Sequence, residues 1–262
     1  MEDIMIQIIP RIEYLSKTRI LEERYEAAYE YNDFYDASVL DDPTKTKVLV
    51  NLYKNLDRDC SMDTLHGAYR EIAVHSKDKK IREISDLRIH QSMDIAEKME
   101  IRGVVFHTNY IANRLDEDYQ KNWLEKNIEF YTQLAKEYDG LQIYMENEFE
   151  FTPDLYVEFA KAMQEVKNFH LCLDIGHANI SQTPIETWLE QAAPYIAHMH
   201  INDNNGNYDV HDAIGSGSID WKKVDALIRK FGIKPSVLVK TKEIDKQEKS
   251  LAYMKKNHIF PF

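Results

Sequence analysis

Histidine and carboxylate side chains recur in this sequence at the ends of short apolar segments. Six of its ten histidines lie at such an end or in the loop after one: His66, His107, His177, His198, His200 and His211. The acids Glu146 and Asp174 also end apolar segments, and Asp209 lies close to His211. Imidazole and carboxylate are the ligands that Zn²⁺, Mn²⁺ and similar divalent ions prefer. A single histidine of this kind is more often structural, but the whole set favours a metal site.

The elements that must position these residues are eight apolar segments, which alternate with longer charged segments of helical character. The predicted strands are Ile4–Ile9, Ala27–Tyr31, Thr64–Gly67, Gly103–His107, Leu141–Glu146, Phe169–Asp174, Ile196–Ile201 and Ser236–Lys240. The clearest predicted helices are Lys79–Lys98, Asp116–Tyr138, Pro153–Val166 and Trp221–Phe231. The segment from Leu15 to Tyr31 is ambiguous, because Glu23–Tyr31 would also continue a helix. The alternation predicts a single (β/α)₈ barrel over residues 1–262, and the strand count favours it over a doubly wound sheet.

A barrel of this kind would bring the polar residues together. Its active site is built where the strands end, at the C-terminal mouth of the barrel. Five consecutive predicted strands end at, or just before, metal-type side chains: His66, His107, Glu146, Asp174 with His177, and His200. Ligands that are far apart in sequence would meet at this mouth, so we expect no short CxxC-type spacing.

Composition narrows the class of protein. The 262 residues include 33 Lys and Arg against 45 Asp and Glu, which gives a formal charge of −12 and a pI near 5.3. A broad basic face for nucleic acid is therefore disfavoured. Two cysteines, Cys60 and Cys172, fit a reducing compartment better than a disulfide framework. With no signal-peptide pattern and no apolar stretch near the ~20 residues of a membrane span, we expect a cytoplasmic protein.

Six short segments resemble the xylose-isomerase-like barrel superfamily. They are LHGAY (65–69), VVFHTN (104–109), YMEN (144–147), LDIGHA (173–178), HMHIND (198–203) and DVHDAIGSGSIDW (209–221). Each segment is short, but their order, spacing and strand-end positions together make the match fairly specific. The superfamily contains sugar-phosphate isomerases and epimerases together with apurinic-site nucleases of the endonuclease IV type. The resemblance therefore implies the same barrel and a choice between these activities.

In the isomerase and epimerase branch, one divalent ion is held by a Glu, an Asp, a His and a final Glu. The resemblance places the first three at Glu146, Asp174 and His200, with Zn²⁺ or Mn²⁺ favoured and Mg²⁺ or Co²⁺ as alternatives. The two glutamates of that pattern also move protons on opposite faces of a bound sugar. Glu146 would then be both a metal ligand and a proton acceptor.

In the nuclease branch, further zinc ions use additional ligands. The resemblance places one set at His66, His107 and Glu146, and another at His177, Asp209 and His211. The corresponding polar groups of the epimerase branch bind substrate hydroxyls or phosphate. The presence of these residues therefore does not decide between the two branches.

The last predicted strand departs from the family pattern. In the segment PSVLVKTKEIDKQEKSL (235–251), Lys240 stands where the final glutamate is expected. An ammonium group has three donors and no lone pair, so it is a poor metal ligand. The two-glutamate proton shuttle therefore lacks one member.

Three consequences of this lysine compete. We hypothesise that Glu146, Asp174 and His200 keep a metal, with water in the vacant position. In the second alternative, the lysine ammonium replaces the cation between Glu146 and Asp174 and leaves that position metal-free. In the third, Glu148 or Glu243 becomes the replacement ligand.

The resemblance implies a sugar or sugar-phosphate isomerase or epimerase that acts on a small polyhydroxy substrate. Glu146 and Lys240 are the predicted catalytic residues, and Lys240 would stabilise negative charge. The alternatives are a metal-dependent apurinic-site endonuclease, a lyase, and a non-catalytic sugar-binding relative. We expect neither nucleic acid nor membrane as a partner, and the resemblance leaves room for a homo-oligomer.

Overall fold

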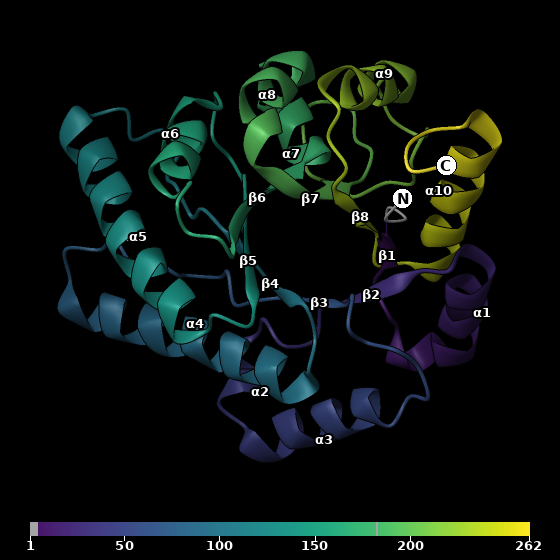
Figure 1. Ribbon diagram of the computed structural model, residues 1–262, viewed down its shortest axis with the longest axis horizontal. Helices are drawn as coiled ribbons and strands as arrows, with labels where there is room; N and C mark the ends of the chain where they lie inside the picture. The colour runs from purple at the N-terminus through teal and green to yellow at the C-terminus, as the bar shows by residue number, and fades with distance from the viewer. Residues whose placement is uncertain (1–4, 182) are drawn as a thin grey trace.

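The chain forms a closed barrel of eight parallel strands with helices around it (Figure 1). The computed structural model describes residues 5–181 and 183–262. The strands are β1 (Ile6–Ile8), β2 (Ala28–Tyr31), β3 (Thr64–His66), β4 (Gly103–His107), β5 (Gln142–Glu146), β6 (Phe169–Asp174), β7 (Ile196–Ile201) and β8 (Ser236–Val239). Each strand pairs with the next, and β8 closes the ring against β1. The predicted (β/α)₈ barrel is therefore confirmed; Ile4, the predicted first residue of β1, lies outside the described residues.

The helices lie outside the ring of strands, as Figure 1 shows. The α-helices are α1 (Leu15–Tyr25), α2 (Ala37–Leu40), α3 (Pro43–Lys54), α4 (Lys79–Met99), α5 (Glu117–Glu137), α6 (Asp154–Ala162), α7 (Ile175–Ile180), α8 (Ile185–Ala192), α9 (Trp221–Phe231) and α10 (Ile244–Asn257). Short 3₁₀ segments cover Ile12–Tyr14 and Ala193–Tyr195. All four predicted helices are present, and α9 has the predicted bounds.

Local sequence explains where α5 begins and which face it buries. The carboxylate of Asp116 accepts a hydrogen bond from the backbone N–H of Tyr119 at 3.0 Å, which satisfies one free donor of the first turn. Trp123 and Tyr131 are buried, while the Lys and Glu residues between them face outward. This is the arrangement that the amphipathic pattern predicts.

Glu26 settles the ambiguous segment between Leu15 and Tyr31. Its φ of 51° lies in the left-handed region, and its backbone N–H donates to the carbonyl of Glu22. A residue in this conformation ends a helix while satisfying one of its last carbonyl groups. The chain leaves α1 there and enters β2, all four residues of which are buried.

Strand register brings the polar strand ends to one level. His107 pairs with Glu146 across β4 and β5, and Asp174 pairs with His200 across β6 and β7. β8 ends at Val239, one residue earlier than predicted, so Lys240 begins the following loop. The Lys240 backbone N–H still donates to the carbonyl of Ile201 at 2.9 Å, which keeps this residue beside β7.

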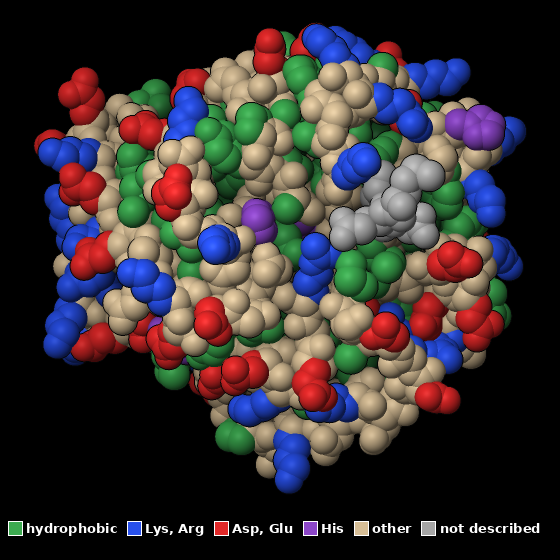
Figure 2. Space-filling view, viewed as in Figure 1, with side chains coloured by type: hydrophobic (Ala, Val, Ile, Leu, Met, Phe, Trp, Pro, Cys, Tyr) green, Lys and Arg blue, Asp and Glu red, His purple; other side chains and the backbone are tan. Residues whose placement is uncertain are grey.

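Apolar side chains between the strands and the helices form the main core, which includes the buried Trp123 and Trp188. The outer surface is mixed in charge. Around the rim of the face in Figure 2, Lys and Arg side chains are interspersed with Asp and Glu. Within residues 5–181 and 183–262, no helix combines the length and the hydropathy that crossing a lipid bilayer requires.

Candidate functional site

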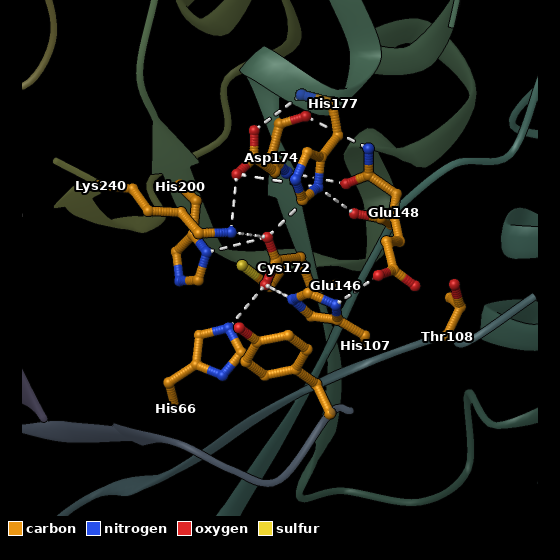
Figure 3. Close-up of polar contacts among 12 residues, drawn as sticks. His66, His107, Thr108, Glu146, Glu148, Cys172, Asp174, His177, His200 and Lys240 are labelled. Carbon is orange, nitrogen blue, oxygen red and sulfur yellow. Dashed lines mark hydrogen bonds and ion pairs between the residues drawn. The ribbon is translucent and has the colours of Figure 1, made fainter. Parts of the chain in front are cut away.

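Lys240, Glu146 and Asp174 form the floor of the barrel mouth. The Nζ of Lys240 donates hydrogen bonds to Oε1 of Glu146 and, at 3.1 Å, to Oδ2 of Asp174. Figure 3 shows the ammonium group directed at the two carboxylates. Both carboxylates are fully buried, and the lysine side chain is only 6% exposed. These are the contacts that the second of the three alternatives describes, and the choice among the three stays a prediction.

Asp174 is held in place from several sides. Its Oδ1 accepts a hydrogen bond from the backbone N–H of His177 at 2.9 Å, so Asp174 also caps α7. The amide of Asn202 donates to both carboxylate oxygens, at 3.2 and 3.3 Å. Gly176 leaves room for that amide, because a Cβ there would lie 2.2 Å from the Asn202 oxygen. The sequence indicated Asp174 as a ligand but not its role as a helix cap.

His200 connects the floor to a deeper polar layer inside the barrel. Its Nδ1 lies 3.1 Å from Oε1 of Glu146, and its Nε2 lies 3.2 Å from Oε2 of Glu30. Glu30, on β2, is fully buried and also accepts a hydrogen bond from Thr64 at 2.9 Å and contacts His198 at 3.2 Å. Sequence reasoning missed Glu30. The available signal was an acid within the predicted strand Ala27–Tyr31.

The first donor group consists of His66, His107 and Glu146. The Nε2 atoms of the two histidines lie 3.4 and 3.1 Å from Oε2 of Glu146. Among the described residues, neither that oxygen nor His107 Nε2 has a partner in hydrogen-bond geometry. One ligand atom from each residue lies within 4.8 Å of the others. Nδ1 of His107 lies 3.1 Å from Oε1 of Glu148, outside hydrogen-bond geometry.

The second donor group consists of His177, Asp209 and His211, and its ligand atoms also lie within 4.8 Å of one another. Oδ2 of Asp209 lies 3.3 Å from Nε2 of His177 and 2.9 Å from Nε2 of His211. Nδ1 of His177 lies 2.7 Å from the carbonyl oxygen of Asn147. His211 has a φ of 47°, a strained conformation for a residue with a side chain. The fold therefore maintains a strained residue within this group.

A sequence profile of the xylose isomerase-like TIM barrel family matches residues 26–257. The chain belongs to this family. An uncharacterized protein of Methanocaldococcus jannaschii, MJ1614, is 28% identical over 183 residues, which cover 70% of this chain and 72% of that protein.

Two solved structures share the xylose isomerase-like fold. A D-tagatose 3-epimerase-like protein is 24% identical, with a TM-score of 0.72 over 96% of both chains. The TTHB071 protein from Thermus thermophilus, studied after soaking with ZnCl₂, is 21% identical, with a TM-score of 0.74 over 97% of both chains. At these identities the two structures establish the likeness of fold.

All nine predicted site residues lie at the mouth of this xylose isomerase-like barrel, within the floor, the two donor groups or their direct contacts. They are His66, His107, Glu146, Asp174, His177, His200, Asp209, His211 and Lys240. Their roles as ligands or catalysts stay predictions. Of the two replacement ligands considered, Glu148 contacts His107, whereas Glu243 pairs with Lys246 at 3.7 Å.

The floor residues stabilise each other's charge. Burial alone would raise the pKa of the Glu146 carboxyl, but the positive charges of His200 and Lys240 hold that pKa well below its usual range. Burial alone would lower the pKa of Lys240, but the carboxylates of Glu146 and Asp174 raise it well above its usual range. At neutral pH, Glu146 is therefore a carboxylate and Lys240 an ammonium ion.

The residues of the second donor group also shift each other's pKa. Burial lowers the pKa of His177, but the charge of Asp174 and a hydrogen bond with Asp209 raise it to about 9. Burial would raise the pKa of Asp209, but hydrogen bonds with His177 and His211 lower it. A carboxylate and a readily protonated imidazole thus lie in contact in this group.

The two donor groups fit a divalent cation, and the floor does not. Imidazole nitrogens and carboxylate oxygens converge in each group, and both Oε2 of Glu146 and Oδ1 of Asp209 lack hydrogen-bond partners among the described residues. On the floor, the Lys240 ammonium already contacts the carboxylate oxygens that would bind an ion.

Two further sets of clustered donors are weaker candidates. Glu146 and Asp174 also cluster with His177, but these are the two carboxylates that Lys240 engages. Cys172 clusters with His198 and His200. Both of those imidazoles are already bonded to Glu30, and burial raises the pKa of the Cys172 thiol to about 12, so it stays protonated.

Proposed function

We propose that this protein is an isomerase-type enzyme that acts on a small polyhydroxy substrate, a sugar or a sugar phosphate. The observation that carries the proposal is the pairing of Lys240 with Glu146 on the floor of the mouth. It combines a cation that can stabilise developing negative charge with a carboxylate that is ionised at neutral pH. Membership of the xylose isomerase-like family supports this choice.

The pair suits proton transfer next to a carbonyl group. Glu146 would accept the proton from the carbon beside the carbonyl; the electron pair of that C–H bond would form a C=C bond, and the π pair of the carbonyl would move onto its oxygen. The resulting enediolate carries one negative charge, which the Lys240 ammonium would stabilise. Return of the proton to the neighbouring carbon, with a proton shift between the two oxygens, converts an aldose into a ketose with all atoms conserved.

The lysine restricts which reaction this site can perform. Epimerisation by the family's two-glutamate pattern needs a second proton-transfer group on the opposite face of the sugar. Lys240 stands at that second position, and its pKa, well above the usual range, keeps it from accepting a proton. A single base serves a proton shift on one face, so we favour aldose–ketose isomerisation over epimerisation.

The two donor groups would hold divalent ions beside this pair. An ion bound there would supply positive charge and polarise substrate oxygens. His66 and His107 would bind it together with Glu146 in the first group, and the second group would bind it without any floor residue. The nitrogen-rich donor sets favour Zn²⁺, and the ZnCl₂ soak of TTHB071 supports testing zinc first.

Hydrogen exchange in deuterated water tests this proposal. The protein, supplied with Zn²⁺ or Mn²⁺, would be incubated with aldoses, ketoses and their phosphates and followed by NMR. We expect deuterium at the carbon beside the carbonyl of at least one sugar, together with the matching aldose or ketose. Glu146→Gln should abolish both signals, and Glu158→Gln, on the exposed face of α6, should change neither.

Other outcomes of the same experiment would contradict the proposal. Inversion at one carbon without aldose–ketose conversion would show that the site epimerises after all. Thermal stabilisation by a sugar without any exchange would favour the non-catalytic sugar-binding alternative.

A second candidate is phosphodiester cleavage at apurinic sites, and the presence of both donor groups favours it. We place it second because the floor ammonium interrupts the central position of the nuclease pattern and the chain carries a charge of −12. Cleavage of a duplex that contains one abasic site, absent in His107→Asn, would reverse this order.

A further inference from the structure

We propose that Lys240 replaces a divalent cation together with its carboxylate ligand, so that the floor contains a permanent cationic side chain and binds no metal. This inference deepens the proposed function by naming the cation of the floor. It can be tested by metal content, whether or not the protein acts on a sugar.

The position of Lys240 is the first argument. Its Nζ bonds to Glu146 and Asp174, two of the three residues that the family resemblance assigns to a metal. The side chain is 6% exposed, and its backbone N–H is bonded to the carbonyl of Ile201 at 2.9 Å. The lysine is therefore a buried part of the floor and not a surface side chain.

Charge conservation is the second argument. A glutamate (−1) with a divalent ion (+2) contributes +1 to the floor, and one lysine ammonium also contributes +1. With Glu146 and Asp174, the total is −1 in both cases. The substitution therefore preserves the charge that the two buried carboxylates require, although it reverses the sign of the side chain.

Space and repulsion give the third argument. A zinc ion would bind carboxylate oxygens at about 2.0–2.2 Å. The Lys240 ammonium already lies within hydrogen-bond distance of the same oxygens, so an ion there would be in contact with a second positive charge. An ammonium group has three N–H donors, and two carboxylates leave one donor for a substrate oxygen.

The inference concerns the floor alone. The two carboxylate oxygens of Glu146 have different neighbours: Oε1 contacts Lys240 on the floor, and Oε2 faces His66 and His107 of the first donor group. A metal in the first or second donor group is therefore compatible with the lysine. The expected difference between the wild type and a Lys240→Glu variant is one metal ion per chain, whatever the wild-type content.

The experiment compares zinc content in the wild-type chain, Lys240→Glu and Lys242→Glu. Each protein would be stripped with a chelator, reloaded with excess Zn²⁺, freed of unbound ion and analysed for zinc per chain. Lys242 is exposed and two residues away, so its variant makes the same change of charge outside the floor. We expect Lys240→Glu to bind one more equivalent than the wild type, and Lys242→Glu to match the wild type.

Equal zinc content in the wild type and a folded Lys240→Glu variant would overturn the inference. If circular dichroism shows that Lys240→Glu does not fold, the wild type alone decides, through anomalous scattering from zinc-soaked crystals. A peak bound by Glu146 and Asp174 would overturn the inference, and its absence would uphold it. Neither result depends on isomerase activity, so failure of the proposed function would be seen separately, as lack of deuterium exchange.

Discussion

The donor groups and the floor share one barrel mouth, and the first donor group also shares Glu146 with the floor, yet they offer opposite chemistry to a cation. In the donor groups, imidazole nitrogens and carboxylate oxygens converge, and several of these atoms lack hydrogen-bond partners among the described residues. On the floor, the Lys240 ammonium group donates hydrogen bonds to the carboxylates of Glu146 and Asp174.

This difference arises from a single residue at the end of β8. The same buried acids can bind a metal ion or form an ion pair. The side chain beside them decides: one with a free lone pair completes a metal site, whereas an ammonium group donates hydrogen bonds to the acids. On the floor, the charge of Lys240 therefore depends on the two buried carboxylates, and their charges depend on Lys240. Each donor group, in contrast, can still bind an ion. Three experiments, in decreasing order of expected effect, test this difference between an ion-paired floor and metal-binding donor groups.

Replacement of Lys240 by Met should destabilise the metal-free protein most. The change leaves Glu146 and Asp174 buried without their cation, and loss of one partner of a buried ion pair costs about 3–5 kcal/mol. The melting temperature, measured in EDTA at pH 7, should fall by roughly 10 °C. Lys242→Met, on an exposed side chain, should leave it unchanged. Equal melting temperatures for Lys240→Met and the wild type would show that the floor is not a stabilising ion pair.

The stability of the metal-free protein should fall between about pH 6.5 and 9. Unfolded histidine has a pKa of about 6.5, and the carboxylates around His177 raise the folded pKa to about 9. Protonated His177 thus stabilises the fold fully below about pH 6.5, and this contribution, at most about 3 kcal/mol, is lost as pH rises through the folded value.

Urea denaturation across this pH range, in EDTA, measures the effect of His177. Asp209→Asn should flatten the profile, because it removes a carboxylate that helps to raise the pKa of His177. Saturating Zn²⁺ should flatten it as well, since a bound ion requires neutral imidazole. An equally steep profile in all three conditions would assign the pH dependence to other groups.

Glu148→Gln should weaken zinc binding by the first donor group about 10–100-fold, because the Glu148 carboxylate is the charged group that contacts the outer ring nitrogen of His107. Competition with a chromophoric chelator measures this affinity, in a His211→Asn background that disables the second group. Glu158→Gln serves as the matched control. Unchanged affinity in Glu148→Gln would mean that the ring is held by packing alone.

Much of this molecule could be predicted from periodicity and strand-end chemistry. Alternating apolar and amphipathic segments predicted the barrel, and the ends of β3 to β7 predicted the ring of histidines and acids. Short helices were harder, because α7 begins directly after Asp174, the last residue of β6, and its six residues carry too little helical periodicity to be recognised. Glu30 was missed for a different reason, since a lone acid in a short apolar strand gives no sign of its partners.

The sequence by itself determined which chemical groups reach the mouth, because side-chain direction in a strand and the position of strand ends follow from local pattern. It also determined that a lysine follows the last strand, where the family resemblance places a glutamate. Only the tertiary structure decided that this ammonium lies against Glu146 and Asp174, which are 94 and 66 residues away in the chain. It likewise decided how the two oxygens of Glu146 are shared between the lysine and the histidines. Contacts of this kind depend on burial and on the simultaneous packing of several strands, which no local segment contains.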